Sequence, residues 1–217
     1  MPRSIRASNS SKGVQNVEKL KKSQALKKFL RNKKAVFGLT IVLLLVLIVI
    51  FLPIVMKLDP YTTDRLAGFN AKPSAEHIFG TDDVGRDLFA RVLYGGRVSL
   101  FVGMASTVIS VAIGIPLGLI AGYFRGIAES IIMRTADAFM SFPSMVLILV
   151  LVAVFGPSIL TVTVVIGVLG WTSIAKLIYG NVLSIRECEY VQAAKAVGTR
   201  TSKILFSEVL PNAITPV

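Results

Sequence analysis

The stretch AVFGLTIVLLLVLIVIFLPIVM, residues 35–56, decides the class of fold. Its 22 residues carry no charge, and at about 1.5 Å per residue a helix of this length crosses a hydrocarbon core of about 30 Å. A charged side chain at its centre would cost roughly 2.5–3.5 kcal/mol on insertion scales, so the absence of charge is informative. The sequence therefore predicts a membrane-spanning helix here.

The composition of the whole chain agrees with several such spans. The 217 residues are 53% hydrophobic and 17% charged, with a mean hydropathy of +0.70, which is too apolar for an ordinary soluble domain. The net charge of +12 comes largely from residues 1–34, which hold eleven Lys and Arg against one acid. The positive-inside rule explains this tail better than nucleic-acid binding does, and no nucleic-acid partner is expected. We expect a cytoplasmic tail that is either solvated or lies as an amphipathic segment on the bilayer surface.

Working outward from the first span, the sequence predicts three more. Phe155-Gly-Pro-Ser158 divides a later apolar run that is too long for one span, and Ser141-Phe142-Pro143 marks a kink before it. The expected order is span 35–56, external loop 57–97, span 98–124, a span at about 130–155, span 158–179 and an elbow at 187–212. Four crossings return the elbow to the cytoplasm. The fold class is therefore expected to be an all-α, polytopic membrane helix bundle.

Small residues repeat in the span at 98–124. Gly114, Gly118 and Gly122 are four residues apart, so they share one helix face, and Pro116 should kink the helix near them. Two interpretations stay open: a seam where a second helix packs closely, or the hinge of a gate.

A glycine- and acid-rich motif lies in the external loop. Gly80 and Gly85 have the spacing of a phosphate-binding loop, but Arg86-Asp87 replaces the Lys-Ser/Thr pair, and Asp82, Asp83 and Asp87 would repel phosphate. A calcium site is an alternative, although the spacing is not that of an EF-hand. We prefer a capped, hydrogen-bonded turn that leads into the next helix, and we expect no metal.

The elbow at 187–212 is a polar segment after a long apolar run, and it indicates two short helices. Residues 189–197 are good helix formers, and Gly198 stands where a left-handed residue would end the first helix. Thr201 or Ser202 can cap the second helix, and Pro211 should stop it.

Several kinds of chemistry are not expected. The chain holds one histidine and one cysteine, Cys188, so it cannot build a disulfide or a Cys or His metal cluster. No nucleotide-binding or hydrolase motif is present, so we expect no catalytic residues and no cofactor, and any energy must come from a partner. Arg134 and Asp137 can pair at i, i+3, and no charge is expected at the centre of a span.

The elbow resembles the conserved cytoplasmic loop of binding-protein-dependent ABC transporter permeases. Its Glu-Ala-Ala core is Glu189, Ala193 and Ala194, followed by Gly198 and closed by Leu210-Pro211-Asn212. The longer spacing after Glu189 resembles the dipeptide, oligopeptide and nickel subfamily. Further pieces that resemble its C-type permease are 29–34, 79–88, 94–100, and Asp137 followed by Phe142-Pro143.

The resemblance implies a permease subunit that forms part of the translocation path of an importer of peptides, or of nickel or another small solute, in a bacterial inner membrane. Its implied partners are ABC ATPase subunits, a second homologous permease and an extracytoplasmic solute-binding protein, besides the lipid bilayer. The elbow would couple to the ATPase through Glu189, Ala193, Ala194, Gly198, Leu210 and Pro211. Alternatives that stay open are a non-transport scaffold, a small channel or an inactive fragment.

The resemblance also implies two further spans after the elbow. The sequence ends at Val217, so we expect a C-terminally truncated permease. Ser207-Glu208 stands where many relatives have a basic pair before the closing Leu-Pro.

Overall fold

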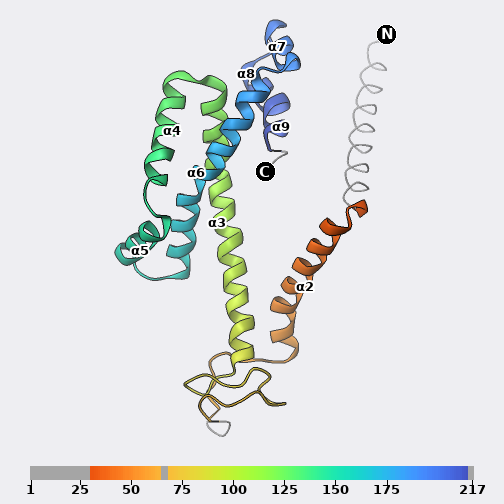
Figure 1. Cartoon of the computed structure of the whole chain (residues 1–217), viewed down its shortest axis with the longest axis vertical. Coiled ribbons are helices and arrows are strands. Elements are labelled where there is room, and N and C mark those ends of the chain that lie inside the picture. The colour runs from red at the N-terminus through yellow and green to blue at the C-terminus, as the bar shows by residue number, and fades with distance from the viewer. Residues whose placement is uncertain (1–29, 65–67, 215–217) are drawn as a thin grey trace, which may run out of the picture. The chain divides into compact units, whose positions relative to one another are not determined.

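The computed structural model describes residues 30–64 and 68–214. The predicted tail at 1–34 lies almost entirely outside the described residues. Within them every regular element is a helix, beside two isolated β-bridges in the loop after α2. The helices, labelled in Figure 1, are α2 Lys33–Val55, α3 Leu88–Phe124, α4 Gly126–Met140, α5 Ser144–Phe155, α6 Ile159–Arg186, α7 Glu189–Ala196, α8 Thr201–Ile204, the π-helical η1 Leu205–Val209 and α9 Leu210–Ile214. The predicted all-α membrane fold is confirmed.

Three helices are long and apolar enough to cross a membrane: α2, α3 and α6. The pair α4 and α5 would make a fourth crossing if it counts as one span, and its two helices meet at 87°. The span predicted at about 130–155 is therefore broken rather than merely kinked. Pro143 precedes α5 and has no N–H to continue the hydrogen-bond ladder of α4, which explains the break at this point.

Helix α3 begins ten residues before the span predicted at 98–124, because Asp87 caps it. The carboxylate of Asp87 accepts a hydrogen bond from the N–H of Ala90 at 2.9 Å. The residues from Leu88 to Arg97, assigned to the external loop by their charge, are helical in consequence. Helix α6 likewise continues to Arg186, beyond the predicted end at 179.

The chain forms two compact units, residues 1–97 and 98–217. In the first unit Arg97 satisfies a carbonyl that a proline leaves without its helical donor. Pro53 lies four residues after Val49 and has no N–H, and Nε of Arg97 donates to the carbonyl of Val49 at 2.9 Å. The guanidinium also stacks over the ring of Tyr94, 4.8 Å from its centroid.

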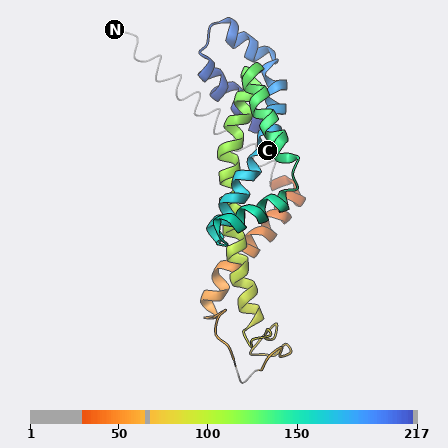
Figure 2. The same cartoon turned by 90° about the vertical axis from the view of Figure 1, so that its left-hand side faces the viewer.

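In the second unit the elbow helices gather beside the C-terminal ends of α3 and α6, as both views show (Figures 1 and 2). A cluster of buried apolar side chains joins them: Leu119, Ile178, Val182, Val191, Ile204, Leu205, Val209 and Ala213. A second cluster, centred on Ala136, Trp171 and Ala175, packs α4 on α6. The elbow is therefore a folded part of this unit.

Candidate functional site

The first half of the elbow ends where the sequence indicates. Helix α7 stops at Ala196, and Gly198 follows with φ +77°, a conformation that favours glycine. The N–H of Gly198 donates to the carbonyl of Lys195 at 2.9 Å, and the N–H of Thr199 donates to that of Ala194 at 3.0 Å. These two bonds satisfy the last carbonyls of α7 and turn the chain towards α8.

The second half of the elbow differs from the prediction. Arg200 is the N-cap residue of α8, and neither Thr201 nor Ser202 caps it, because both already have helical positions. Pro211 does not stop the helix, which continues to Ile214. A π-helical turn from Leu205 to Val209 precedes the proline. Its wider i→i+5 hydrogen-bond pattern accommodates the proline ring, so the helix is not interrupted.

The predicted coupling residues do not all face the same way. Glu189, Ala193 and Gly198 are exposed on α7 and its end, whereas Ala194 and Leu210 pack against the buried cluster. Pro211 is exposed. The exposed surface also includes Val197, which is 85% exposed and which sequence reasoning did not single out.

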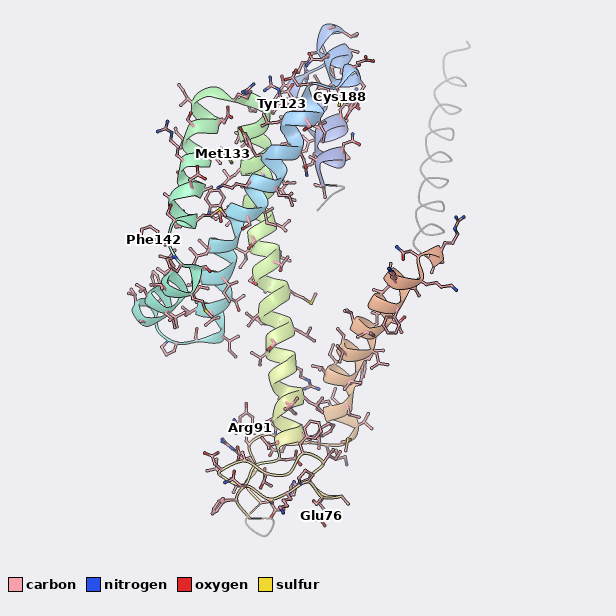
Figure 3. The ribbon with its side chains drawn as sticks, in the orientation of Figure 1. Glu76, Arg91, Tyr123, Met133, Phe142 and Cys188 are labelled. Atoms are coloured by element: carbon pink, nitrogen blue, oxygen red, sulfur yellow. The ribbon has the colours of Figure 1, made fainter. Side chains whose placement is uncertain are left out.

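Two basic side chains, one at the end of α6 and one in the elbow, contact the end of α3. Nη1 of Arg186 donates to the carbonyls of Tyr123 at 3.0 Å and Gly122 at 3.4 Å, which are terminal carbonyls of α3. The ammonium of Lys195 lies over the Tyr123 ring, 5.1 Å from its centroid. Figure 3 shows Tyr123 and Cys188 at this end of the unit. The C-terminal ends of α3 and α6 are therefore adjacent.

The three regularly spaced glycines of α3, Gly114, Gly118 and Gly122, face α6. A Cβ at Gly118 would lie 2.5 Å from the carbonyl oxygen of Ala175, and one at Gly114 would lie 2.6 Å from Cβ of Ile174. At Gly122 it would lie 2.8 Å from Cβ of Val182. Helix α3 continues through Pro116.

Helix α6 contributes small residues of its own to this contact. A Cβ at Gly167 would lie 2.7 Å from Cβ of Ile109, and one at Gly170 would lie 2.3 Å from Oγ of Ser110. The hydroxyl of Ser110 donates to the carbonyl of Gly167 at 2.9 Å, an interhelical hydrogen bond that joins α3 to α6. The i, i+3 spacing of Gly167 and Gly170 is the signal that sequence reasoning missed.

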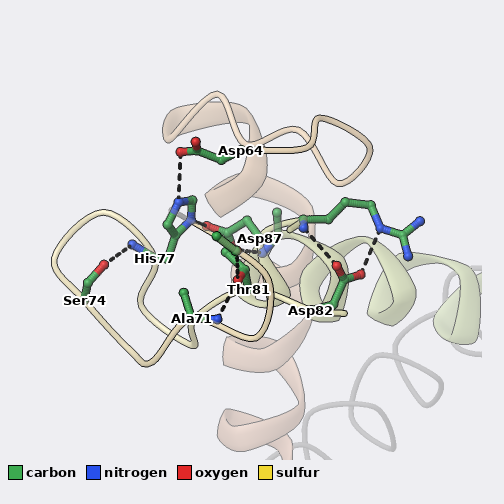
Figure 4. Close-up of polar contacts among 10 residues, drawn as sticks. Asp64, Ala71, Ser74, His77, Thr81, Asp82 and Asp87 are labelled. Atoms are coloured by element: carbon green, nitrogen blue, oxygen red, sulfur yellow. Dashed lines mark hydrogen bonds and ion pairs between the residues drawn. The ribbon is translucent and has the colours of Figure 1, made fainter. Parts of the chain in front are cut away.

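The loop motif folds around two aspartates (Figure 4). Oδ1 of Asp82 accepts the N–H groups of Val84 and Arg86, both at 2.9 Å, while Oδ2 accepts Nε of Arg86 at 2.8 Å and Nη1 of Arg91 at 3.1 Å. Asp87 caps α3 through one oxygen and contacts Nδ1 of His77 at 2.9 Å through the other. Asp83 is exposed.

The two glycines of the motif have left-handed backbone. Gly80 has φ +75°, and a Cβ there would lie 2.1 Å from the carbonyl oxygen of Ala71; Gly85 has φ +78°. Within the described residues no three His, Cys, Asp or Glu side chains group to hold a metal. The geometry is that of a hydrogen-bonded turn.

The loop shifts the pKa of two of its side chains. The hydrogen bond to Asp87 raises the pKa of His77 above its ordinary 6.5, against burial, which would lower it; Asp64 adds to the rise. Burial would raise the pKa of Asp82, but the hydrogen bonds from Arg86 and Val84 outweigh it and lower that pKa to about 2.

We expect the loop to lose stability as the pH rises through the raised pKa of His77. The stabilisation by charged His77 is complete below its ordinary pKa of 6.5 and disappears above its folded value. Asp82 stays ionised over this range, because its pKa is lowered to about 2. The stabilisation by its carboxylate is lost only as the pH falls through that value. NMR titration of the single histidine should give a pKa above 6.5.

Asp87→Asn is the matched variant for this titration. Asparagine keeps the oxygen that caps α3 but loses the negative charge that faces His77. The pKa of His77 should fall in this variant while helix content is unchanged. An unmoved titration curve would show that Asp87 is not the cause.

The described structure is that of a multi-span membrane protein whose two longest apolar helices pack through glycine and carry a folded elbow at one end. The family described as binding-protein-dependent transport system inner membrane component matches residues 114–217, from Gly114 on α3 through the elbow. The N-terminal transmembrane domain of oligopeptide transport permease C matches residues 23–73. The chain belongs to this family of membrane transport components, of the oligopeptide permease C type.

Curated relatives agree over most of the chain. The oligopeptide transport system permease protein OppC of Bacillus subtilis (strain 168) is 37% identical over 190 residues, 88% of this chain and 62% of the relative. The dipeptide transport system permease protein DppC of Alkalihalophilus pseudofirmus is 39% identical over 197 residues, 89% of this chain and 64% of the relative. The glutathione transport system permease protein GsiD of Pectobacterium atrosepticum is 36% identical over 194 residues, 88% of this chain and 64% of the relative. The chain thus spans somewhat under two thirds of the length of these relatives.

Proposed function

We propose that the chain is a permease subunit of an ATP-driven importer of peptides. It forms part of the translocation path, and ATP is hydrolysed by separate ATPase subunits. A second permease and an extracytoplasmic solute-binding protein complete the importer. Family membership and the printed functions of the relatives as oligopeptide and dipeptide permeases support the substrate class.

The observation that carries the proposal is the two-faced elbow. Its inner face is fixed, because Val191, Ile204 and Val209 are at most 1% exposed and hold it on α3 and α6. Its outer face offers Glu189, small Ala193 and the apolar Val197 to solvent. A rigid, protruding surface with small and apolar residues is suited to enter a groove on an ATPase and to pass its movement to the span helices.

The same contacts support a cytoplasmic N-terminus. Arg186 joins the C-terminal end of α6 to the C-terminal end of α3, so these two ends lie on the same side of the membrane. The α4 and α5 pair, which connects α3 to α6, must then cross to the opposite side. If α2, α3, the α4 and α5 pair and α6 each cross once, the four crossings support an elbow on the same side of the membrane as the N-terminus. The positive-inside rule supports the cytoplasm as that side, because basic residues stand both at the start of α2 and in the elbow: Arg31, Lys33, Lys34, Arg200 and Lys203.

Disulfide crosslinking tests the docking. Cys188 is the only cysteine and is half-buried, so Cys188→Ser with Val197→Cys gives a single, exposed thiol at the tip of the elbow. We expect Val197→Cys to crosslink to cysteines along the groove of the ATPase, and the yield to change between the nucleotide-free and ATP-bound states. Crosslinked product on denaturing gels is the measurement.

The matched control is Phe155→Cys in the same background. Phe155 is also apolar and 71% exposed, but it lies at the end of α5, before the turn into α6. It should give no crosslink. Equal yields from the two positions, or none from Val197 at several groove positions, would contradict the docking.

A further inference from the structure

A charged groove lies between α4 and α6. It has a volume of about 610 Å³ and is lined by Glu129, Ser130, Met133, Arg134, Asp137, Lys176 and Tyr179. Figure 3 shows Met133, on α4, turned towards α6. The sequence predicted an Arg134–Asp137 pair and no charge at the centre of a span. Asp137 instead pairs with Lys176 of α6, which lies across the groove.

Lipid is an unsuitable cover for this groove. Lys176 lies about 25 Å along α6 from Ile159, at about 1.5 Å per residue, and so within the span. Its side chain is 38% exposed and that of Asp137 is 61% exposed. Charged side chains within a span almost always face the bundle interior or a water-filled cavity, because hydrocarbon does not solvate them. The groove therefore faces water or a polar group.

The groove is lined by two acidic and two basic side chains, but only one of the basic side chains has an ionic partner among the described residues. Glu129 accepts a hydrogen bond from the hydroxyl of Tyr179 and pairs with Nε of Arg125 at 3.6 Å. Asp137 pairs with Lys176. Arg134 is exposed on the same wall and has no ion pair or hydrogen bond with any described side chain. Because Arg125 pairs with Glu129 from outside the lining, Arg134 is left as a cation without an acidic partner in the part of the chain that the structure describes. Its guanidinium has the fork geometry that suits a carboxylate.

We propose that this groove lines the water-filled path and that Arg134, assisted by Lys176, binds the carboxylate of the transported solute. The inference rests on the proposed function and adds to it the chemistry by which the path holds a peptide. Lys176 can release Asp137 and pair with the carboxylate of the solute instead. Asp137 can then pair with the ammonium group of the solute. A phosphate of an anionic lipid has related chemistry, and the test separates it from the solute.

Uptake by the complete transporter in vesicles is the first measurement, with trialanine and its C-terminal amide as probes. Arg134→Gln should raise the half-saturating concentration of trialanine roughly tenfold, the worth of one charged hydrogen bond, and leave that of the amide unchanged. Arg31→Gln, an exposed arginine before α2, is the matched control and should change neither. Equal effects of Arg134→Gln on the two peptides would overturn the proposal. So would an effect seen only in vesicles with phosphatidylglycerol and not in neutral phosphatidylcholine.

Thiol labelling tests the site without relying on transport. Ser130→Cys in the Cys188→Ser background places a thiol in the groove without removing a charge. A water-soluble anionic methanethiosulfonate should label it quickly, and trialanine, but not its amide, should slow labelling several-fold. Leu177→Cys, beside Lys176 but outside the groove, is the control, and its slower labelling should be unaffected by trialanine. No labelling of Ser130→Cys, or no protection, overturns the inference, whereas protection without any uptake counts against the proposed transport alone.

Discussion

Gly118→Val is expected to disrupt the packing of α3 against α6 and to cost about 3 kcal/mol or more of the free energy of unfolding. A Cβ at Gly118 would lie 2.5 Å from the carbonyl oxygen of Ala175 and 2.8 Å from Cβ of Ile178. The nearest atom belongs to the backbone, so a rotamer change cannot relieve the clash, and the two helices must separate. Separation opens the buried cluster that also holds the elbow. Chemical unfolding in detergent, followed by near-UV circular dichroism, measures the loss.

Gly103→Val is the matched control, since it makes the same change in the same helix. A Cβ at Gly103 meets nothing within 4 Å. Gly118→Ala should fall between the two variants, because its single methyl group already takes the clashing position. The expected order of destabilisation is Gly118→Val, then Gly118→Ala, then Gly103→Val. If Gly118→Val and Gly103→Val unfold alike, the close approach of α3 to α6 is not what holds this unit together.

Gly198→Pro is expected to reduce uptake by the assembled transporter more than tenfold while the chain still assembles. Proline requires φ near −65°, whereas Gly198 has φ +77°. The ring also removes the N–H that donates to the carbonyl of Lys195 at 2.9 Å. The turn between α7 and α8 must then change, and the exposed surface of α7 moves away from its proposed partner. Uptake and ATP hydrolysis, measured on the same vesicles, report the coupling.

A graded series separates local strain from loss of the turn. Asparagine tolerates the left-handed region, and a Cβ at Gly198 meets nothing within 4 Å, so Gly198→Asn should keep most of the uptake. Gly198→Ala should lose about 1 kcal/mol of local stability, because only its φ is unfavourable. The stability of the α3 and α6 packing should be unchanged in all three variants. Full uptake by Gly198→Pro would remove the elbow from the coupling mechanism.

The sequence predicts most of the local structure of this chain. Hydrophobic length predicts the helix that became α2, and Gly198 predicts the end of α7, both through properties of a few neighbouring residues. Pro143 predicts a kink at the right position but not the full break before α5. The motifs of the loop and the elbow also suffice to indicate the permease family, which the matches confirm. These signals are local, because a charge-free run or a left-handed residue has the same effect whatever the tertiary structure around it.

Only the tertiary structure decides which side chains meet across helices. Asp137 pairs with Lys176 rather than Arg134, and Ala194 faces the core although Ala193, its neighbour, is exposed. The carbonyl of Val49 depends on Arg97, far along the chain, because Pro53 removed its local donor. The physical reason is the same in each case: hydropathy and backbone preference act over one turn, whereas a partner is set by how distant helices approach. The charged groove follows from that approach, and from no motif in the sequence.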